Sequence, residues 1–510
     1  MSEAKDIGER LVDRGILTAD TLRAARLESE QTQEALTRVL VHGGHITRQQ
    51  LLHATVGDSD RSLSTEPFYS DRVPDSVLLR LRVMLMGDLG NTLYLSTDSP
   101  RAYVQRALRP YFPGRVFQFV GYEPDRFEEY MEELERWSSA PDSLDGILRS
   151  AVRRKVSDIH LVPKAGSYTL MFRELGVRQL IRDLSVEEAS RIIAQAKDRA
   201  SLDIAERRVP HDGAFREVML GRPIDCRVAT IPEVEGEAMV IRVLDPEATS
   251  PALGDLGMRE SDQEAWRAAF GSPFGLCLVC GPTGSGKSTT LNATIREMDR
   301  YGRAIYTVEE PVEYRLSFLG QVEVNRATGL GFAEALRSFL RGDPDVIVVG
   351  EIRDYETAML AVRAADTGHL VLATLHADSN RAAIDRLIEM GVPIENFADR
   401  LRGILSQRLV RTTCPACVGA GCAECHDLGY DGRTMLAEVS RFRNRKEVER
   451  FRFDDERYET MLDHGFECMR EEIVAPQELR RVFGNEFNEA MALAPDGELP
   501  PPTSLYAQTE

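Results

Sequence analysis

One glycine-rich stretch limits what this chain can fold into more than any other feature. Leu276 to Cys280 is a short apolar run, typical of a buried parallel strand, and a helix-like segment extends from Ser288 to Met298. Residues 281–288 between them fit the pattern G-x-x-x-x-G-K-[ST] of a phosphate-binding loop. Glycines let backbone N–H groups curl around phosphate oxygens, and the N-terminus of the following helix adds partial positive charge.

This pattern predicts which residues meet a nucleotide. Lys287 is expected at the β- and γ-phosphates and the Ser288 hydroxyl at Mg²⁺. The alternative is a glycine-rich turn that matches by chance, but here strand, loop and helix follow one another in the required order. The predicted nucleotide-binding residues are Gly281, Pro282, Thr283, Gly284, Ser285, Gly286, Lys287, Ser288 and Thr289.

Composition limits the possible partners. The 63 Lys and Arg residues against 82 Asp and Glu residues give a net charge of −19, which argues against nucleic acid as the main partner. The sequence contains no long apolar run, so we expect no membrane-spanning segment, and its first residues lack the apolar core of a signal peptide. A chain of 510 residues predicts about two to four domains.

The first part of the chain predicts small modules. A helical module is expected at 1–58, because the Leu-Val-x-x-Gly pattern that begins at Leu11 recurs from Leu40. Each copy predicts a helix, a glycine turn and a second helix, with Thr18 or Thr47 as its N-cap. An α+β module follows at 66–123, and its expected elements are strands at 91–97 and 115–120 and a helix at 101–108.

The remaining parts are larger. A linker is expected at 124–143, beginning with an acidic helical segment. A second α+β domain at 144–246 has predicted strands at 168–172, 224–229 and 237–244 and a helix at 186–199. The domain with the phosphate loop is expected at 250–490, and residues 491–510, which include several prolines, as a disordered tail.

Further motifs follow the phosphate loop in a fixed order. They are T-V-E-E-P-V-E-Y at 307–314, V-I-V-V-G-E-I-R-D at 346–354 and T-G-H-L-V-L-A-T-L-H at 367–376. With the loop, they closely resemble the Walker A, Asp-box, Walker B and His-box blocks of the secretion ATPases of type II secretion and type IV pilus assembly. The resemblance extends to 157–160, 202–210 and 432–434 and covers about residues 140–490.

The resemblance implies a fold, an activity and partners. It implies a RecA-like P-loop core preceded by an α+β, PAS-like domain, and a homo-hexamer that hydrolyses ATP with Mg²⁺. Its expected place is the cytoplasm, peripheral at the inner membrane through an inner-membrane platform protein and a membrane-anchored docking protein. An ATPase for DNA uptake or conjugative transfer is one alternative. A non-hydrolysing regulatory scaffold is another, although Lys287, Ser288, Glu351 and His376 are all present.

Carboxylates are expected at one sheet edge. Glu351 follows the apolar run Val346 to Val349, which we expect beside the phosphate-loop strand, so its carboxylate could organise Mg²⁺ and the attacking water. Glu309 and Glu310 end a neighbouring strand-like run; by resemblance Glu309 is the Asp-box acid, and which carboxylate activates water stays open. The alternative is a set of surface acids that cap helices.

A histidine and several arginines complete the predicted site. By resemblance His376 senses the γ-phosphate; the alternative is a structural core histidine. Arg337 and Arg341, spaced i,i+4, should share one helix face and could supply positive charge to the transition state. The resemblance adds Arg208, Arg222 and Arg227 from the preceding domain, although Ala214 stands where relatives often have arginine. Any of these arginines could instead form a surface ion pair.

Four cysteines predict a metal site. Cys414, Cys417, Cys422 and Cys425 form two C-x-x-C pairs, the ligand number of a structural zinc site, and two glycines make the short turn between the pairs feasible. Reduced thiols or a redox pair are the alternative. Relatives carry such an element at this place, whereas pilus-retraction ATPases usually lack it, so it favours assembly or secretion over retraction.

The N-terminal repeat resembles a helical module that in some relatives binds cyclic-di-GMP. That binding uses an arginine near the start of the first copy, where this chain has Asp6. Because an aspartate disfavours an anionic dinucleotide, docking to a membrane-anchored partner is the favoured role for this module.

Overall fold

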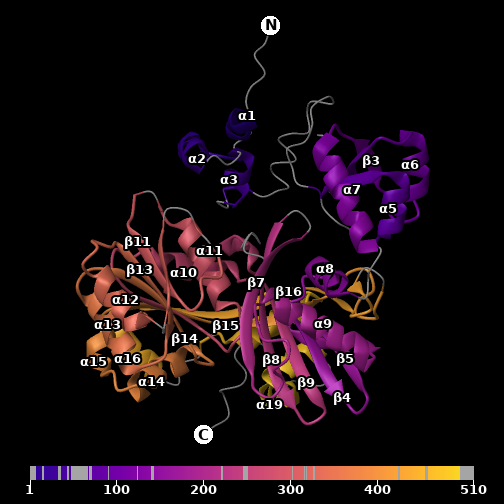
Figure 1. The fold of residues 1–510 in the computed structure, drawn as a ribbon. Coiled ribbons are helices and arrows are strands. Elements are labelled where there is room, and N and C mark those ends of the chain that lie inside the picture. The colour runs from indigo at the N-terminus through magenta and orange to yellow at the C-terminus, as the bar shows by residue number, and fades with distance from the viewer. Residues whose placement is uncertain are drawn as a thin grey trace. The chain divides into compact units, whose positions relative to one another are not determined.

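The computed structural model divides the chain into two compact units, Met1–Thr249 and Ser250–Glu510 (Figure 1). None of the helices in the described part of the chain has the length and apolar character needed to cross a membrane. The structure describes residues 7–13, 16–32, 36–42, 45–46, 67, 72–89, 91–122, 124–138, 143–219, 222–244, 251–300, 302–314, 316, 319–325, 328–422, 425–453 and 458–493.

The described part of the predicted N-terminal module is helical, and the helix expected after Thr47 lies outside the described residues. Its helices are α1 (Ile7–Asp13), α2 (Ala19–Thr32) and α3 (Leu36–His42), packed around a small leucine-rich core. Thr18 is the N-cap of α2, as predicted, because its Oγ1 accepts a hydrogen bond from the N–H of Thr21 (3.2 Å). Asp6 and the second predicted cap, Thr47, lie outside the described residues.

The next module is α+β. A three-stranded sheet is formed by β1 (Val83–Leu89), β2 (Thr92–Thr97) and β3 (Val116–Phe119), with α5 (Asp75–Leu81), α6 (Arg101–Leu108) and α7 (Pro124–Ser138) around it. The acidic helical segment predicted at the start of the 124–143 linker is α7, but α7 belongs to this module and is not part of a linker. Phe127, Tyr130 and Leu134 at helical spacing are buried in the core of this module. Residues 139–142 lie outside the described part.

The following α+β domain is built on an antiparallel sheet. Its strand order is β6-β5-β4-β9-β8-β7, and its helices α8 (Leu144–Arg153) and α9 (Val186–Arg199) contribute to one apolar core. Ser185 and Glu188 form a capping box at the start of α9, so the predicted helix begins at 186 as expected. The strands are β4 (Asp158–Lys164), β5 (Ser167–Glu174), β6 (Val177–Leu184), β7 (His211–Met219), β8 (Arg222–Glu233) and β9 (Gly236–Leu244).

The second unit contains a seven-stranded, mostly parallel sheet. Its order is β12-β11-β13-β14-β10-β15-β16, with only the β15–β16 pair antiparallel. The expectation that the run at 346–349 lies beside the phosphate-loop strand is wrong, because β14 separates β13 from β10. The strands are β10 (Gly275–Cys280), β11 (Ile305–Glu309), β12 (Gly320–Glu323), β13 (Val346–Ile352), β14 (Leu370–Leu375), β15 (Leu401–Thr413) and β16 (Tyr430–Arg441).

Both faces of this sheet are covered, which explains its unbroken apolar strands. Along β10, Leu276 and Leu278 face one core, with residues of α12 (Phe332–Phe339), α13 (Tyr355–Asp366) and α14 (Asn380–Glu389). Cys277 and Val279 face the other, with residues of α10 (Glu260–Phe270) and α11 (Lys287–Glu297) (Figure 1). The observed layers are those of the predicted RecA-like α/β fold.

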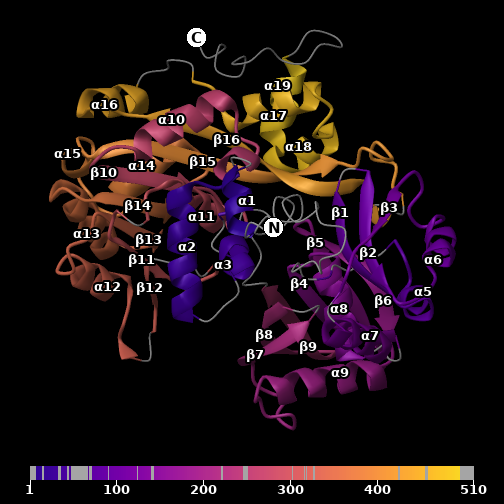
Figure 2. The same cartoon turned by 90° about the horizontal axis from the view of Figure 1, so that it is seen from above.

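The C-terminal helices pack on the β15–β16 end of the sheet (Figure 2). They include α17 (Met461–Arg470), α18 (Pro476–Phe483) and α19 (Asn485–Ala492). Helix α16 (Arg445–Phe453) packs against α14 instead, and a short α15 (Ile394–Phe397) precedes β15. The predicted tail overlaps α19 at 491–492, and residues 494–510 lie outside the described part.

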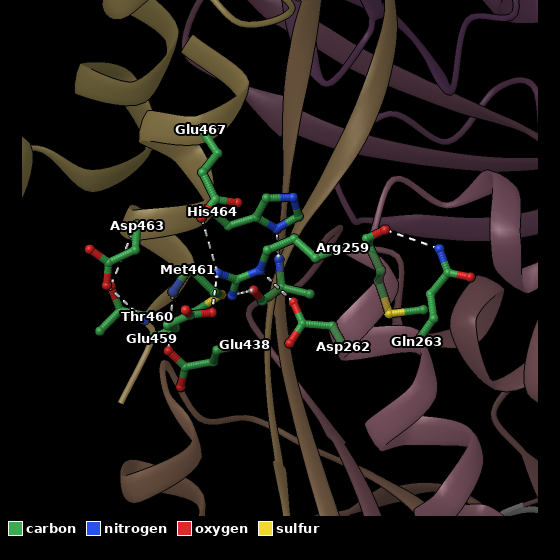
Figure 3. A network of polar contacts seen from close by, with 12 residues as sticks. Arg259, Asp262, Gln263, Glu438, Glu459, Thr460, Met461, Asp463, His464 and Glu467 are labelled. Atoms are coloured by element: carbon green, nitrogen blue, oxygen red, sulfur yellow. Dashed lines mark hydrogen bonds and ion pairs between the residues drawn. The ribbon is translucent and has the colours of Figure 1, made fainter. Parts of the chain in front are cut away.

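A polar network joins α17 to β16 and the start of α10 (Figure 3). Arg259 Nε lies 2.8 Å from Asp262 Oδ2, and its Nη1 lies 2.7 Å from Glu459 Oε2. His464 Nδ1 accepts a hydrogen bond from the N–H of Ala437 in β16 (3.1 Å). Buried polar groups thus connect the C-terminal helices with the sheet.

Candidate functional site

The phosphate loop connects β10 to α11, as its sequence predicts. Gly281 has φ +148°, and a Cβ there would lie 2.5 Å from the backbone oxygen of Gln407 in β15, so only glycine fits. Lys287 Nζ donates hydrogen bonds to the carbonyls of Gly281 (2.8 Å) and Pro282 (3.0 Å). Burial lowers the pKa of Lys287, and the nearby charge of Glu351 opposes that shift. The ammonium group therefore lies within the loop, where phosphate oxygens could replace its carbonyl partners.

A chain of ionisable side chains lies along the carboxyl edge of the sheet. Glu351, near the end of β13, places Oε1 2.9 Å from His376 Nε2, just after β14. Its Oε2 lies 2.6 Å from Arg353 Nε, and Arg353 Nη1 lies 2.7 Å from Glu310 Oε2. The structure thus brings together Glu310, Glu351 and His376, which sequence analysis had placed on three separate strands.

Glu309 has different surroundings. Its Oε1 accepts hydrogen bonds from Thr307 Oγ1 (2.7 Å) and Gln321 Nε2 (3.2 Å). Burial raises the pKa of Glu309, and these two hydrogen bonds oppose that rise. Of the two predicted acids, it is Glu310 that shares a partner with Glu351.

The arginines of this unit are less favourably placed than predicted. Helix α12 ends at Phe339, so Arg341 does not continue the helix face of Arg337. The N–H of Arg341 bonds to the carbonyl of Ser338 (3.1 Å) in the tightened turn that follows, and Pro344 disfavours helix at the residue before it. Arg337 forms ion pairs with Glu334 (3.1 Å) and Glu356, so contact with a phosphate would require new partners.

The arginines of the first unit lie on or near its antiparallel sheet. Arg208 is paired with Glu206 (Nη2–Oε2, 2.6 Å), yet its side chain is 87% exposed. Arg222 begins β8, and exposed Arg227 of the same strand stands opposite Ala214 of β7. The departure from the family pattern at 214 therefore leaves a small side chain beside Arg227.

The four cysteines lie close together in the segment that connects β15 to β16. Their Sγ atoms all lie within 4.8 Å of one another. The Cys414–Cys422, Cys417–Cys425 and Cys422–Cys425 sulfur distances are 3.9, 3.8 and 3.7 Å. A tetrahedral zinc ion with Zn–S bonds of about 2.3 Å needs sulfur–sulfur edges of about 3.8 Å, so this cluster fits the ion.

Backbone donors also suit thiolate ligands. The N–H of Gly421 bonds to Cys417 Sγ (3.2 Å), and the N–H groups of Cys422 (3.3 Å) and Gly429 (3.2 Å) bond to Cys425 Sγ. Burial raises the pKa of Cys425, but these hydrogen bonds outweigh burial and hold it at about 7. Gly421 has φ +89°, the left-handed conformation expected of the short turn between the pairs.

Comparison with known proteins decides the family. Residues 134–476 match the family of type II/IV secretion system proteins. This chain belongs to that family. Type II secretion system protein E of Pseudomonas aeruginosa is 41% identical over 342 residues, which cover 62% of this chain and 68% of that protein.

Two further comparisons cover a larger share of both proteins. The type IV pilus assembly ATPase PilB of Myxococcus xanthus is 30% identical over 506 residues, covering 86% of this chain and 89% of PilB. The structure of the Legionella pneumophila ATPase DotB aligns with a TM-score of 0.52 at 22% identity, covering 67% of this chain and 95% of DotB. That structural likeness supports the fold.

Sequence analysis missed two residues that the structure places at the candidate site. Arg353 links Glu310 to Glu351. Gln407 is 1% exposed and bonds to both the phosphate loop and α11. The strand of Gln407 also contains Arg402, Arg408 and Arg411, so no sequence signal distinguished Gln407 as a buried polar residue.

Proposed function

We propose that this chain hydrolyses ATP to power the assembly of a pilus or pseudopilus and the protein secretion that depends on it. The observation that carries the proposal is the joint arrangement of Lys287 in the phosphate loop and the Glu310–Arg353–Glu351–His376 chain at the same carboxyl edge. Open α/β sheets bind their ligands at this edge.

Each group has a role in this proposal. The backbone N–H groups of 281 and 283–289 and the Lys287 ammonium would hold the phosphates, next to Pro282, which has no N–H. Ser288 would ligate Mg²⁺, which neutralises charge between the β- and γ-phosphates. Glu351 would orient the attacking water, because its second oxygen is anchored by Arg353. His376, bonded to the other oxygen, would report on the γ-phosphate. Glu310 is the better supported second acid, since Glu309 is bonded to Thr307 and Gln321.

Replacement of the carbonyl partners of Lys287 by phosphate oxygens should favour nucleotide binding. Lys287 now donates to two neutral carbonyls. Phosphate oxygens carry negative charge, so they add direct charge–charge attraction to the hydrogen bond and are better acceptors for the ammonium group than neutral carbonyls. Loss of such a charged hydrogen bond costs on the order of 1.5–3 kcal/mol, or about 10- to 150-fold in affinity.

The finer statements rest on family membership. We infer a homo-hexamer in the cytoplasm, held at the inner membrane by a platform protein and a membrane-anchored docking protein. The tetracysteine element supports assembly or secretion rather than retraction, and its sulfur spacing supports one zinc ion held by Cys414, Cys417, Cys422 and Cys425. Arg208, Arg222, Arg227, Arg337 and Arg341 remain proposed phosphate contacts that act when the hexamer closes on ATP.

Phosphate release by the purified full chain tests the proposed activity. Wild-type protein should release phosphate from ATP in the presence of Mg²⁺, and Lys287→Ala should lose this activity together with nucleotide binding. Lys446→Ala, an exposed lysine of the same unit, is the matched control and should retain activity. A folded wild-type chain that binds ATP without releasing phosphate would identify a non-hydrolysing scaffold instead.

A further inference from the structure

A buried glutamine joins three parts of the second unit. Gln407 lies on β15, whose neighbouring residue Ser406 pairs with Cys280 at the end of β10. Its Nε2 donates a hydrogen bond to the carbonyl of Ser285 in the phosphate loop (2.6 Å). Its Oε1 accepts a hydrogen bond from Thr290 Oγ1 in α11 (2.7 Å). One side chain thus connects the strand, the loop and the helix that follows the loop.

The orientation of this amide is determined by its partners. A carbonyl oxygen can only accept, so the amide nitrogen must face Ser285 and the amide oxygen must face Thr290. Thr290 is itself held, because Thr294 Oγ1 donates to its carbonyl (2.8 Å) and accepts from Trp266 Nε1 (2.9 Å). All of these side chains are at most 1% exposed. A buried network in which these side chains are hydrogen-bonded to one another favours a single geometry.

The contact with Ser285 has a consequence for the next residue. In a trans peptide the C=O and the following N–H point in opposite directions. A Ser285 carbonyl held against Gln407 therefore turns the N–H of Gly286 away from β15. Gly286 has φ +90°, and a Cβ there would lie 3.2 Å from Gln407 Nε2, so the glycine allows the amide to approach.

We propose that Gln407 is a positioning residue for the nucleotide. Gln407 fixes the orientation of the Ser285–Gly286 peptide. The Gly286 N–H then points toward the phosphates that the loop encloses, which are the β- and γ-phosphates and not the α-phosphate that AMP also has. This inference rests on the proposed nucleotide binding by the loop. Gln407 therefore contributes to the affinity for the β- and γ-phosphates and does not affect the contacts with adenosine.

Binding of ADP, ATP and AMP to the full chain, measured with a fluorescent nucleotide and competition in EDTA, tests this role. Gln407→Met keeps a similar volume but removes the amide, and should weaken ADP and ATP binding about three- to tenfold, the usual net worth of one hydrogen bond. AMP competition should change less than twofold. Thr290→Val, which frees the amide oxygen, should weaken ADP binding in the same direction by less.

The matched control is Ser406→Ala. Ser406 is buried on the same strand, and its Oγ donates to Asn380 Oδ1 (2.7 Å), a contact outside the loop. This variant should bind all three nucleotides within twofold of wild type. Folded Gln407→Met and Thr290→Val proteins that bind ADP like wild type would overturn the inference, as would an equal loss for AMP and ADP. A wild-type chain that binds no ADP or ATP would instead contradict the proposed function itself.

Discussion

His464 should make the stability of the second unit depend on pH. The side chain is 4% exposed, and its Nδ1 accepts the N–H of Ala437 (3.1 Å), so the neutral ring carries its proton on Nε2 (Figure 3). Burial, and then the charge of Arg259, lower the pKa of His464 to about 4. The unfolded chain, with a histidine pKa of about 6.5, therefore binds more protons between these two values.

The sign and size of the effect follow from this difference. Stability from His464 is fully present above pH 6.5 and is lost as the pH falls toward the folded value of about 4. At pH 5 the loss is about 2 kcal/mol, and at pH 7.5 it is close to zero. Glu438, whose pKa burial raises to about 7, has the opposite dependence, so a variant is needed to isolate the histidine.

His464→Asn provides that comparison, since the asparagine Oδ1 can take the place of Nδ1 as acceptor for Ala437 without titrating. In a Trp137→Phe background, Trp266 is the only tryptophan, and it is fully buried in the second unit. Urea unfolding followed by its fluorescence at pH 7.5 and 5.0 gives the two free energies. Wild type should lose about 2 kcal/mol more than His464→Asn between these pH values. An equal loss in both proteins would refute the reasoning.

Three further outcomes are expected. Elemental analysis should find about one zinc per chain, and Cys417→Ser should lose it and melt at a lower temperature; folded wild-type protein without zinc would contradict the site. Glu310→Gln should slow phosphate release more than Glu309→Gln does, because only Glu310 contacts Arg353; the reverse order would assign the second acid to Glu309. If Arg208, Arg222 and Arg227 contact the γ-phosphate, the distances between labels on the two units should differ between the protein with an ATP analogue and the protein with ADP. Identical distance distributions in the two states would exclude that contact.

The sequence alone could predict the phosphate loop because its signal is contiguous. Apolar strand, glycine turn and helix follow one another within 276–298, and each depends on local sterics and hydrogen bonds. The order of the strands could not be predicted in this way. Nothing in the run at 346–349 indicates that β14 lies between it and β10, because parallel pairing depends on how distant crossovers pack.

The contacts among site residues were equally non-local. Glu351 was expected at the sheet edge. Its partner Arg353 lies two residues later, and no sequence pattern shows that the two side chains form a contact. Gln407 is 122 residues away from Ser285 along the chain, so only the fold shows that they meet. The i,i+4 spacing of Arg337 and Arg341 was misleading, because α12 ends at Phe339 and the turn that follows has i→i−3 hydrogen bonds.

The identity of the nucleotide held by Glu351→Gln tests the central claim most directly. The variant and its control, Glu389→Gln, which alters an exposed ion pair with Arg386, are incubated with ATP and Mg²⁺ and separated from free nucleotide. We predict that Glu351→Gln retains bound ATP and releases phosphate at least about 100-fold more slowly than wild type, because the group that orients water has lost its charge. Glu389→Gln should convert ATP to ADP at the wild-type rate. Near-normal turnover by Glu351→Gln would contradict the account.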